Sequence, residues 1–338
     1  MSVKIAINGF GRIGRAAFRV ALTKSNVKVV AINDLMPPDV LAHLLQYDTV
    51  YGVFNGKVSF DDKNLIVNGK KYPVLAEKEP ELLPWKKLGV EVVLECTGRF
   101  TKKEEAALHI KAGAKKVVLS APAKGGGVAT NILGVSDSSK IKDNVISNAS
   151  CTTNCISPIA QVMVSAFGVK KAMMTTIHSY TAEQNLVDGP PPSLHKDLRR
   201  ARAAAQNIVP TTTGAAIATA EVIPELKGLF DGLAIRVPTI CVSLSDFTFV
   251  LKKSVNKEEV NKVFIKASQS PRYKGIMAVT NEPLVSSDFI GNPHSVIVDL
   301  SLTQVVSGDL VKVVGWYDNE WGYANRLVEM AGMVASSK

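Results

Sequence analysis

Short apolar runs alternate with amphipathic stretches along the first 122 residues of the chain. Four runs are rich in β-branched residues and are followed by glycine, polar or turn-forming residues, so they predict strands at 3–8, 27–34, 90–98 and 114–122. Apolar positions recur at helical spacing over 15–25 and again over 102–114, between these runs. Strands and helices that alternate in this way predict a parallel sheet covered by helices on both faces.

The second half of the chain has a different pattern, in which strand-like runs succeed one another. These runs cover residues 170–181, 232–238, 245–253, 295–306 and 310–318. They predict a mainly antiparallel sheet with helices on one face, and the final segment, 322–337, predicts a helix. Because 338 residues exceed the length over which one hydrophobic core usually grows, two domains are expected.

A glycine-rich turn joins the first predicted strand to the first predicted helix. Gly9, Gly11 and Gly14 match G-x-G-x-x-G, in which the glycines permit a tight turn, approach to a pyrophosphate, and packing of helix on strand. Asp34 ends the next strand, where a carboxylate can accept hydrogen bonds from both hydroxyls of an adenosine ribose. The unit predicts a Rossmann-type dinucleotide-binding domain. Because Asp34 would repel a 2′-phosphate, NAD is favoured over NADP.

The ends of the later strands supply further candidate cofactor contacts. In parallel α/β sheets, ligands bind beyond the carboxyl ends of the strands. This places Thr97 and Gly98 at the end of one predicted strand, and Ser120 and Ala121 at the end of the next, among the candidates. Small residues are also what tight strand-to-helix turns need, so a purely structural role stays open for each of them.

Charge limits the classes of partner. Forty Lys and Arg against 30 Asp and Glu give a formal net charge of +10, which suits nucleic acid, an anionic membrane surface or anionic small molecules. The basic residues are mostly scattered, and the densest cluster, 196–207, lacks the interleaved aromatic residues of a single-strand nucleic-acid groove. Nucleic acid is therefore not expected as the main partner.

Hydropathy and cysteine usage bear on the compartment. No apolar run approaches the roughly 20 residues that span a bilayer, so no membrane span is expected, and the early glycines argue against a signal peptide. The four cysteines form no C-x-x-C pair and are too sparse for a disulfide framework. A reducing compartment, the cytoplasm, fits best.

Cys151 is the residue with the clearest candidate chemistry. It opens the segment 151–167, which predicts a helix with Ser150 as its N-cap. Pro158 conflicts with this prediction, because an interior proline should kink or delay a helix. A cysteine in the first turn would meet unpaired N–H groups and the helix dipole, which favour the thiolate and can stabilise an oxyanion beside it.

A nucleophilic thiol needs a base within hydrogen-bond reach, and His178 is the candidate. It lies at the end of the run 170–181, and Cys151 also follows a strand-like run, so we expect the two side chains to converge. A lone histidine is more often structural, and that alternative stays open. Cys155 is expected to be packed in the core. No metal site is expected, because C-x-x-x-C without a second Cys or His pair offers too few zinc ligands.

A thiol nucleophile beside a nicotinamide indicates one reaction. The thiolate adds to an aldehyde, the hemithioacetal loses a hydride to NAD, and an acyl acceptor resolves the resulting thioester. His178 would take the hydroxyl proton during hydride transfer. The residues therefore indicate an aldehyde oxidoreductase that acts with NAD.

Six motifs occur in order along the chain, namely AINGFGRIGR, SNASCTTNC, HSYT, PTTTGAA, IRVPT and WYDNEWGYANR. Together they resemble the phosphorylating glyceraldehyde-3-phosphate dehydrogenase family across essentially the whole chain. The resemblance implies oxidative phosphorylation of D-glyceraldehyde 3-phosphate to 1,3-bisphosphoglycerate, in glycolysis or gluconeogenesis, by a homotetramer. It implies an NAD-binding Rossmann domain, 1–150 with a C-terminal helix from about 319 to 338, and an α+β catalytic domain, 151–318.

The resemblance also assigns roles to residues at matching positions. It makes Cys151 the nucleophile and His178 its activating base. The residues implied for the substrate phosphate are Thr181 and Arg236, and Arg200 is implied as a further substrate-contacting arginine. Those implied for the attacking inorganic phosphate are Ser150, Thr152, Thr213 and Gly214. The residues implied as cofactor contacts are Arg12, Ile13, Asp34, Lys78, Ser120 and Asn319, the last holding the nicotinamide carboxamide.

Two of these assignments have physical support of their own. Arg236 lies inside an apolar run, where a guanidinium is costly unless an anion or a carboxylate meets it, so a structural salt bridge is the alternative. Residues 211–216 supply hydroxyls and a bare glycine backbone at a predicted helix start, which suits a phosphate.

One segment departs from the family pattern, and two other functions stay open. The loop 182–209 contains a proline run, and the family uses this loop at its tetramer core and near a neighbouring subunit's cofactor. The departure bears on the oligomer contacts and on the choice between NAD and NADP. The alternative functions are an erythrose-4-phosphate dehydrogenase, which would prefer water as acyl acceptor, and a basic nucleic-acid-binding protein.

Overall fold

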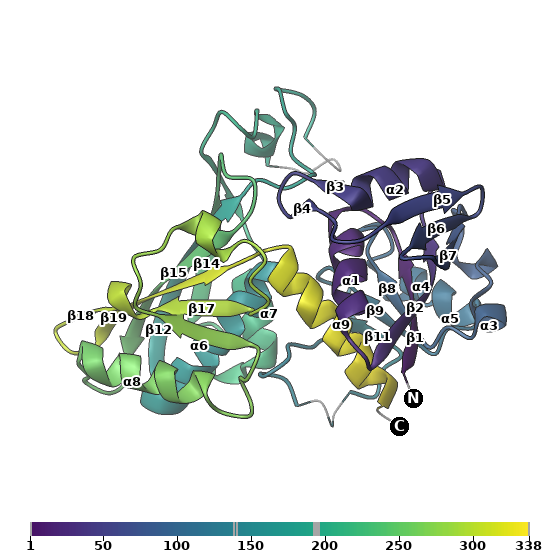
Figure 1. Ribbon diagram of the computed structural model, residues 1–338. Coiled ribbons are helices and arrows are strands. Elements are labelled where there is room, and N and C mark those ends of the chain that lie inside the picture. The colour runs from purple at the N-terminus through teal and green to yellow at the C-terminus, as the bar shows by residue number, and fades with distance from the viewer. Residues whose placement is uncertain (1, 138, 140, 192–196, 337–338) are drawn as a thin grey trace. The chain divides into compact units, whose positions relative to one another are not determined.

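A computed structural model describes residues 2–137, 139, 141–191 and 197–336, and within it the chain divides into two compact units (Figure 1). Unit 1 comprises Met1–Asn131, Asp137–Ala149 and Ala324–Lys338. Unit 2 comprises Ile132–Ser136 and Ser150–Tyr323. Residues 192–196, which include part of the unusual proline run, lie outside the described residues.

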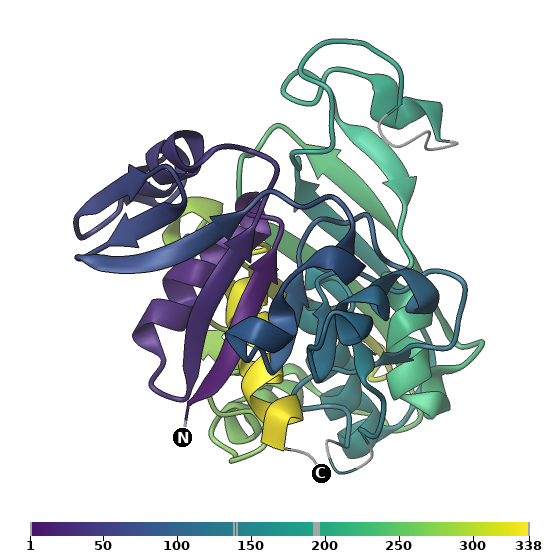
Figure 2. The same cartoon turned by 90° about the vertical axis from the view of Figure 1, so that its right-hand side faces the viewer.

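Unit 1 contains a sheet in the order β10-β11-β9-β8-β1-β2-β7-β6-β5. The strands, in that order, are Ala129–Thr130, Val145–Ser147, Lys116–Leu119, Val92–Glu95, Val3–Asn8, Val27–Asn33, Lys70–Leu75, Asn64–Val67 and Val58–Asp61. Every pairing from β10 to β7 is parallel, and β6 and β5 continue the sheet in antiparallel fashion. Figure 2 shows the purple strands β1 and β2 side by side. The predicted parallel sheet is confirmed.

Helices connect these strands, and one of them differs from its prediction. The helices are α1 (Arg12–Thr23), α2 (Pro38–Gln46), η1 (Pro80–Leu82), α3 (Trp85–Leu88), α4 (Lys103–Ala106) and α5 (Leu108–Lys111), and β3 (Tyr47–Asp48) pairs with β4 (Gly52–Val53). The stretch 102–114 is thus two short helices and not one. The turn tightens at Ala107, whose carbonyl accepts from the N–H of Ile110, three residues later, and His109 is fully buried beyond this break.

Unit 2 contains a sheet in the order β13-β14-β12-β15-β19-β17-β16, with β18 also paired to β19. These strands, in the same order, are Val209–Thr212, Phe230–Val237, Val169–Ser179, Ser243–Leu251, Leu310–Tyr317, Val296–Asp299, Met277–Thr280 and Gln304–Val306. Two pairs, β12 with β14 and β16 with β17, are parallel, and the others are antiparallel. The sheet is therefore mainly antiparallel, as predicted.

Helices pack on this second sheet and fix which side chains it buries. They are α6 (Cys151–Phe167), η4 (Leu198–Ala201), α7 (Ala215–Val222), η5 (Pro224–Leu226), α8 (Lys257–Ser268), η6 (Ser286–Phe289) and η7 (Leu300–Leu302). Helix α6 contacts β12, β15, β17 and β19. Along β12, Met174, Thr176 and His178 are buried whereas Met173 is exposed, the alternation expected when helices cover one face.

The helix predicted over 151–167 is confirmed, and Pro158 does not delay it. The helix runs without a break from Cys151 to Phe167 and contains Pro158 as its eighth residue. Proline removes one backbone hydrogen bond from such a helix, but Ile156, Ile159 and Met163 around it are buried. Burial of these side chains outweighs the local preference.

The C-terminal helix forms as predicted. Helix α9 spans Trp321–Ser336. Within unit 1, Glu329 of this helix forms ion pairs with Arg326 and with Lys24, the residue that follows α1. Gly332 lies so close to Asn26 that a Cβ at this position would come within 2.9 Å of the Asn26 side chain. Among the described residues, no helix is both long enough and apolar enough to cross a membrane.

Candidate active site

Cys151 is the first residue of α6, directly after the predicted N-cap. Ser150 has extended backbone, and its Oγ accepts a hydrogen bond from Thr153 N at 3.0 Å, so the prediction of this cap is confirmed. Ala149 before it adopts φ +53 and is fully buried, a strained conformation for an alanine that costs on the order of 1–3 kcal/mol. The strain lies next to the cysteine, where the chain turns into the helix.

His178 meets Cys151, as the sequence predicts. The distance from Cys151 Sγ to His178 Nε2 is 3.5 Å. The other ring nitrogen, Nδ1, lies 2.6 Å from the carbonyl oxygen of Ser179. Because a carbonyl can only accept, Nδ1 must carry the proton, and Nε2 of the neutral ring faces the sulfur as an acceptor. The thiol therefore donates to the histidine.

Burial favours the uncharged form of both groups. Burial raises the pKa of the Cys151 thiol, against the opposing effects of Arg236 and Thr152. Burial, followed by the positive charge of Arg236, lowers the pKa of His178 to about 3. Backbone N–H groups of the first helical turn and Arg236 do favour the Cys151 thiolate, as expected, but loss of solvation has the larger effect on its pKa.

Strand pairing brings Arg236 to this histidine. In the parallel pair β12 and β14, His178 is in register with Arg236, so both side chains lie on one face. Arg236 NH1 donates to Thr181 Oγ1 at 2.9 Å, to Gln184 Oε1 at 3.3 Å and to the Ser179 carbonyl at 3.4 Å. The guanidinium predicted to need an anion is thus held next to His178 by neutral acceptors.

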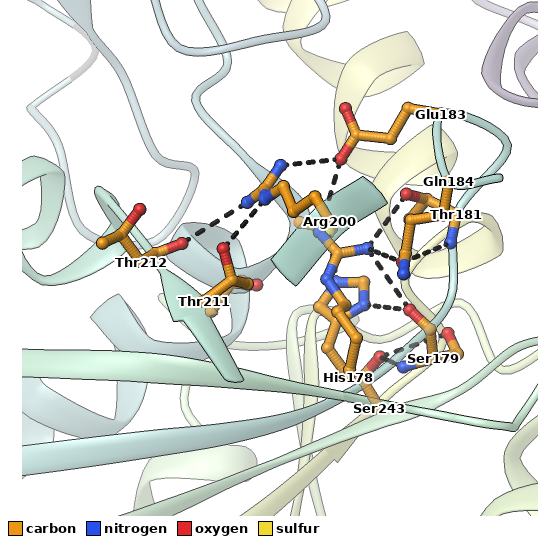
Figure 3. Close-up of polar contacts among 12 residues, drawn as sticks. His178, Ser179, Thr181, Glu183, Gln184, Arg200, Thr211, Thr212 and Ser243 are labelled. Atoms are coloured by element: carbon orange, nitrogen blue, oxygen red, sulfur yellow. Dashed lines mark hydrogen bonds and ion pairs between the residues drawn. The ribbon is translucent and has the colours of Figure 1, made fainter. Parts of the chain in front are cut away.

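A second arginine reaches the same cluster from the loop that follows β12. Arg200 Nε donates to Thr211 Oγ1 at 2.9 Å, and its NH1 pairs with Glu183 at 3.0 Å (Figure 3). Glu183 also pairs with Arg236, at 3.8 Å. Thr181, Arg200 and Arg236, which the resemblance implies as substrate contacts, therefore lie in one cluster.

The residues predicted for inorganic phosphate lie at two helix starts of unit 2. Gly214 is the N-cap of α7, with open space where a Cβ would stand, and Thr213 Oγ1 accepts from Ala215 N at 3.2 Å. Thr152 lies in the first turn of α6, and its hydroxyl is 3.0 Å from the phenol of Tyr317. That phenol also meets Thr176 at 2.8 Å, so a fixed hydroxyl chain supports Thr152.

Asn319 is buried in unit 2, with its amide held in one orientation. Its Oδ1 accepts from Ser179 Oγ at 2.9 Å and from Ser243 Oγ at 3.2 Å. Because hydroxyls donate to the oxygen, the amide nitrogen must be the other atom. The arrangement is suitable for an amide that donates to a ligand.

The glycine turn of unit 1 has the close approaches that its motif predicts. Gly9 adopts φ +91, and a Cβ there would lie 2.8 Å from Thr97 N. A Cβ on Gly14 would lie 2.0 Å from the Gly9 carbonyl oxygen, so only glycine permits this packing of α1. Gly11 has nothing within 4 Å of a Cβ position, which leaves its backbone open to a ligand. These residues fit a pyrophosphate.

The other predicted cofactor residues of unit 1 lie at or near the carboxyl ends of its strands. Asp34 follows β2 and accepts from Phe10 N at 2.7 Å, which fixes the carboxylate against the glycine turn. Arg12 begins α1 and pairs with Asp48 at 2.5 Å. The remaining residues are Ile13 in α1, Lys78, which is exposed, Thr97 after β8 and Ser120 after β9.

Several polar residues of the site were missed at the level of sequence. Glu183 and Gln184 lie within five and six residues of His178, and their charge and polarity beside the HSYT motif could have singled them out. Ser243 and Tyr317 come from other strands, and only the pairing of β15 with β19 brings them into register. Nothing in the local sequence indicates either contact. Within the described part of the chain, no group of three or more His, Cys, Asp or Glu is placed to hold a metal ion.

These features define a class: a protein with a Rossmann-type α/β unit and, in a second unit, a cysteine–histidine pair beside two arginines. Comparison with known proteins gives the family. Residues 3–103 match the family model described as glyceraldehyde 3-phosphate dehydrogenase, NAD binding domain, and residues 150–319 match that of the C-terminal domain. The chain therefore belongs to the glyceraldehyde 3-phosphate dehydrogenase family.

Individual relatives match over nearly their whole length. Glyceraldehyde-3-phosphate dehydrogenase of Geobacillus stearothermophilus is 53% identical over 338 residues, 99% of each chain. Glyceraldehyde-3-phosphate dehydrogenase 1 of Bacillus cereus is 53% identical over 98% of each chain. Glyceraldehyde-3-phosphate dehydrogenase of Streptomyces coelicolor is 50% identical over 99% of each chain.

Proposed function

We propose that Cys151 and His178 catalyse the NAD-dependent oxidative phosphorylation of D-glyceraldehyde 3-phosphate to 1,3-bisphosphoglycerate, a reaction of glycolysis and gluconeogenesis. The observation that carries the proposal is the 3.5 Å contact between Cys151 Sγ and an imidazole whose Nδ1 is held by a carbonyl. It leaves Nε2 as the proton acceptor at the sulfur. The family, an NAD-dependent oxidoreductase family, supports the substrate and the cofactor.

The first covalent step joins Cys151 to the aldehyde. His178 Nε2 takes the thiol proton while the sulfur bonds to the carbonyl carbon, and the proton passes to the aldehyde oxygen to give a hemithioacetal. Backbone N–H groups in the first turn of α6 are suited to stabilise the negative oxygen during this step.

The second step needs a hydride acceptor and the same base. NAD, when bound, accepts the hydride that leaves the former aldehyde carbon. His178 Nε2 takes the hydroxyl proton as the hydride leaves, and a thioester on Cys151 results. The contact of Nδ1 with the Ser179 carbonyl leaves Nε2 without a proton and therefore available to accept this one.

Inorganic phosphate completes the reaction. A phosphate oxygen bonds to the thioester carbon, the carbon–sulfur bond breaks, and the acyl phosphate leaves. The thiolate regains a proton from His178, and the proton of the incoming phosphate is released. For the substrate phosphate we assign Thr181, Arg200 and Arg236, because guanidinium groups bind phosphate through charge-assisted hydrogen bonds. For the attacking phosphate we assign Ser150, Thr152, Thr213 and Gly214, because helix N-termini bind anions.

For cofactor binding we assign the glycine turn, Asp34 and the strand-end residues of unit 1, together with Asn319. The division of labour proposed is cofactor binding by residues 1–150 with the helix from about 319, and chemistry by 151–318. Asp34 favours NAD over NADP, since a 2′-phosphate would meet its carboxylate. The relatives give no support to the erythrose 4-phosphate or nucleic-acid alternatives.

We further propose that the chain works as a homotetramer in the cytoplasm. Met173 and Leu233 are 65% and 42% exposed. The register of β12 with β14 places them on the face opposite His178, where a second copy can cover them. Sedimentation of the intact protein tests the tetramer, and a monomer would contradict it. The four cysteines are free thiols, which suits a reducing compartment.

An absorbance assay of NADH formation tests the proposed activity. The protein is given glyceraldehyde 3-phosphate with NAD or NADP, and with phosphate, arsenate or neither. We expect NADH formation that requires NAD and is much faster with phosphate or arsenate than without. Equal rates without phosphate would indicate that water is the acyl acceptor, and no NADH with any acceptor would overturn the proposal.

A further inference from the structure

Glu183 is a charged residue of the site to which the reaction gives no role. It lies on the loop after β12, and its Oε1 pairs with Arg200 NH1 at 3.0 Å and with Arg236 NH2 at 3.8 Å. Figure 3 shows this carboxylate at the guanidinium of Arg200, on the side away from Thr211 and Thr212. A single carboxylate oxygen thus serves two arginines.

The cluster is short of negative charge. The two arginine side chains are only 14% and 13% exposed, and among the described residues one carboxylate balances two guanidinium charges. Burial lowers the pKa of Arg236, and Arg200 lowers it further, whereas Glu183 and the Cys151 sulfur raise it. Two positive charges in a largely buried cluster with too little counter-charge favour the entry of a further anion.

Two buried donors in the cluster also lack acceptors. Gln184 is 9% exposed, and its Oε1 is used by Thr181 N and by Arg236, yet its Nε2 has no hydrogen-bond partner in the described part of the chain. Arg236 Nε is likewise buried without a partner among those residues. Buried donors without partners are destabilising, because they have lost their hydrogen bonds to water. The cluster is therefore built for an acceptor that the carboxylate of Glu183 does not supply.

The position of Glu183 makes its ion pairs replaceable. Its side chain is 44% exposed, whereas both arginines are nearly enclosed. Ion pairs of such exposed carboxylates are weak, because water and salt screen them. A dianionic phosphate can displace the carboxylate from the arginines, but a monoanion gains little by doing so.

We propose that Glu183 is a specificity-determining residue: it is a resident counter-anion for Arg200 and Arg236, which competes with incoming anions and thereby selects dianionic phosphates over monoanions. The inference rests on the proposed function, since the phosphates concerned are those of its substrates. It predicts that loss of the carboxylate tightens phosphate binding and weakens discrimination against monoanions.

The test compares Glu183→Gln with Asp188→Asn. Asp188 lies on the same loop and pairs with Arg202 at 2.7 Å, but both of these side chains are more than half exposed, and the contacts of Asp188 are with Arg202 and Ala203 rather than with the arginines of the site. The two variants therefore make the same change in net charge, and only one of them removes the counter-anion. Glu183→Asp is a third variant, which keeps the charge but shortens the reach.

Binding of inorganic phosphate is measured by calorimetry, binding of the substrate phosphate is measured as the KM for glyceraldehyde 3-phosphate in the NADH assay, and inhibition by chloride is measured at a fixed concentration of glyceraldehyde 3-phosphate. For Glu183→Gln we expect phosphate to bind about three- to tenfold more tightly, the size of a lost competing ion pair, and chloride to inhibit at correspondingly lower concentration. Asp188→Asn should match the parent in both readouts. Glu183→Asp should lie between the parent and the glutamine variant.

Unchanged or weaker phosphate binding by Glu183→Gln would overturn the inference, because it would mean that the carboxylate only holds the arginines in place. An equal gain in Asp188→Asn would overturn it as well, since net charge alone would then explain the tighter binding. An intact protein that forms no NADH would contradict the proposed function instead. The calorimetric phosphate titration still decides the inference in that case.

Discussion

Two buried charged groups, one in each unit, differ in how completely their hydrogen bonds are satisfied. In unit 1, Glu95 ends β8 and is only 2% exposed, yet no Lys or Arg of the described residues pairs with it. Its oxygens accept from the side chain of Asn8 at 2.6 Å, from the backbone and hydroxyl of Thr97, and from the His109 ring at 3.0 Å. Four neutral donors thus replace water around one carboxylate.

The donors of this network are themselves fixed. Trp85 Nε1 lies 3.0 Å from His109 Nδ1, and an indole can only donate. Nδ1 must therefore be the acceptor, so His109 is neutral and its Nε2–H points at Glu95. Asn8 is fixed in the same manner, because its Oδ1 accepts from Asn33 at 2.7 Å.

Arg236 in unit 2 contrasts with this closed network. It shares a partly exposed carboxylate with Arg200, and its own Nε and the neighbouring Gln184 Nε2 are buried without acceptors among the described residues. A satisfied network rigidifies the fold, whereas buried donors that lack partners are tolerated where a ligand will supply them. The difference agrees with the proposed roles, in which Glu95 stabilises the fold and Arg236 binds the substrate phosphate.

The largest expected effect comes from the proposed nucleophile. Replacing Cys151 with Ser removes the thiol and should lower kcat for aldehyde oxidation by on the order of 10⁴-fold or more. NAD binding and thermal stability should change little, because Ser differs from Cys in a single side-chain atom and the substitution leaves the network around Glu95 unchanged. The NADH assay and an NAD titration by fluorescence measure the two. Normal turnover by the variant would refute the covalent mechanism.

Replacing His178 with Asn should produce the second largest effect. The variant loses the acceptor at the sulfur, and the rate should fall by roughly 10²- to 10⁴-fold, the usual contribution of a general base. Alkylation of Cys151 by iodoacetamide should slow as well, since the thiol no longer has a proton acceptor at 3.5 Å. A rate close to that of the parent would mean that another group activates the thiol.

Replacing Glu95 with Gln should lower stability and leave activity nearly unchanged, the reverse of the two substitutions in the site. An amide nitrogen then faces donors, and charge-assisted hydrogen bonds are lost, so we expect a loss of about 2–4 kcal/mol in stability. Activity of the folded protein should stay within about twofold of the parent. Denaturant midpoints at fixed protein concentration measure the change.

Glu91→Gln is the matched control for this experiment. Glu91 precedes β8, accepts from Lys4 N and pairs with Lys115, but its side chain is 30% exposed. The same substitution there should cost under about 1 kcal/mol. Equal losses at the two positions would contradict the view that burial without a cation is what makes Glu95 costly to change.

The sequence predicts the local parts of this comparison and not the long-range ones. The glycine turn, the Ser150 cap and the strand ending at His178 each depend on a few consecutive residues, and all three are confirmed. The contact between Cys151 and His178 was predictable because Cys151 follows one predicted strand and His178 lies near the end of another. The helix predicted over 151–167 forms with these bounds, and the kink or delay expected at Pro158 does not interrupt it, because tertiary burial overrides local propensity. The stretch 102–114 was expected to be helical throughout and is divided at Ala107.

Contacts set by strand order could not be predicted from spacing. Arg236 lies beside His178 because β14 pairs with β12 in register, 58 residues later. Glu95 meets His109 because α5 folds back on β8, while the pairing of β8 with β1 brings it to Asn8. Composition does not indicate that the buried Glu95 has a full set of hydrogen-bond donors whereas the cluster around Arg236 has not. That distinction depends on hydrogen-bond partners from several elements.

The smallest expected effect concerns pH, and it follows from the burial of His178. Burial, then Arg236 and Arg200, lower the pKa of this ring to about 3, whereas an unfolded chain has the ordinary value of about 6.5. Between these values the unfolded state binds a proton that the folded state does not. Stability therefore falls as pH falls below 6.5, by up to about 1.4 kcal/mol per pH unit from this residue.

His178→Asn removes the titrating ring and should flatten the loss of stability between pH 6.5 and about 4.5, a window above the range in which most carboxylates titrate. Denaturant midpoints across this window, compared with the parent, measure the slope. His43→Asn, a change at an exposed histidine of unit 1, is the control and should leave the slope as it is in the parent. Parallel slopes for His178→Asn and the parent would show that the ring takes up its proton without unfolding. In that case the open site would hold a cation next to Arg236, and the contrast with the closed network around Glu95 would rest on the arginines alone.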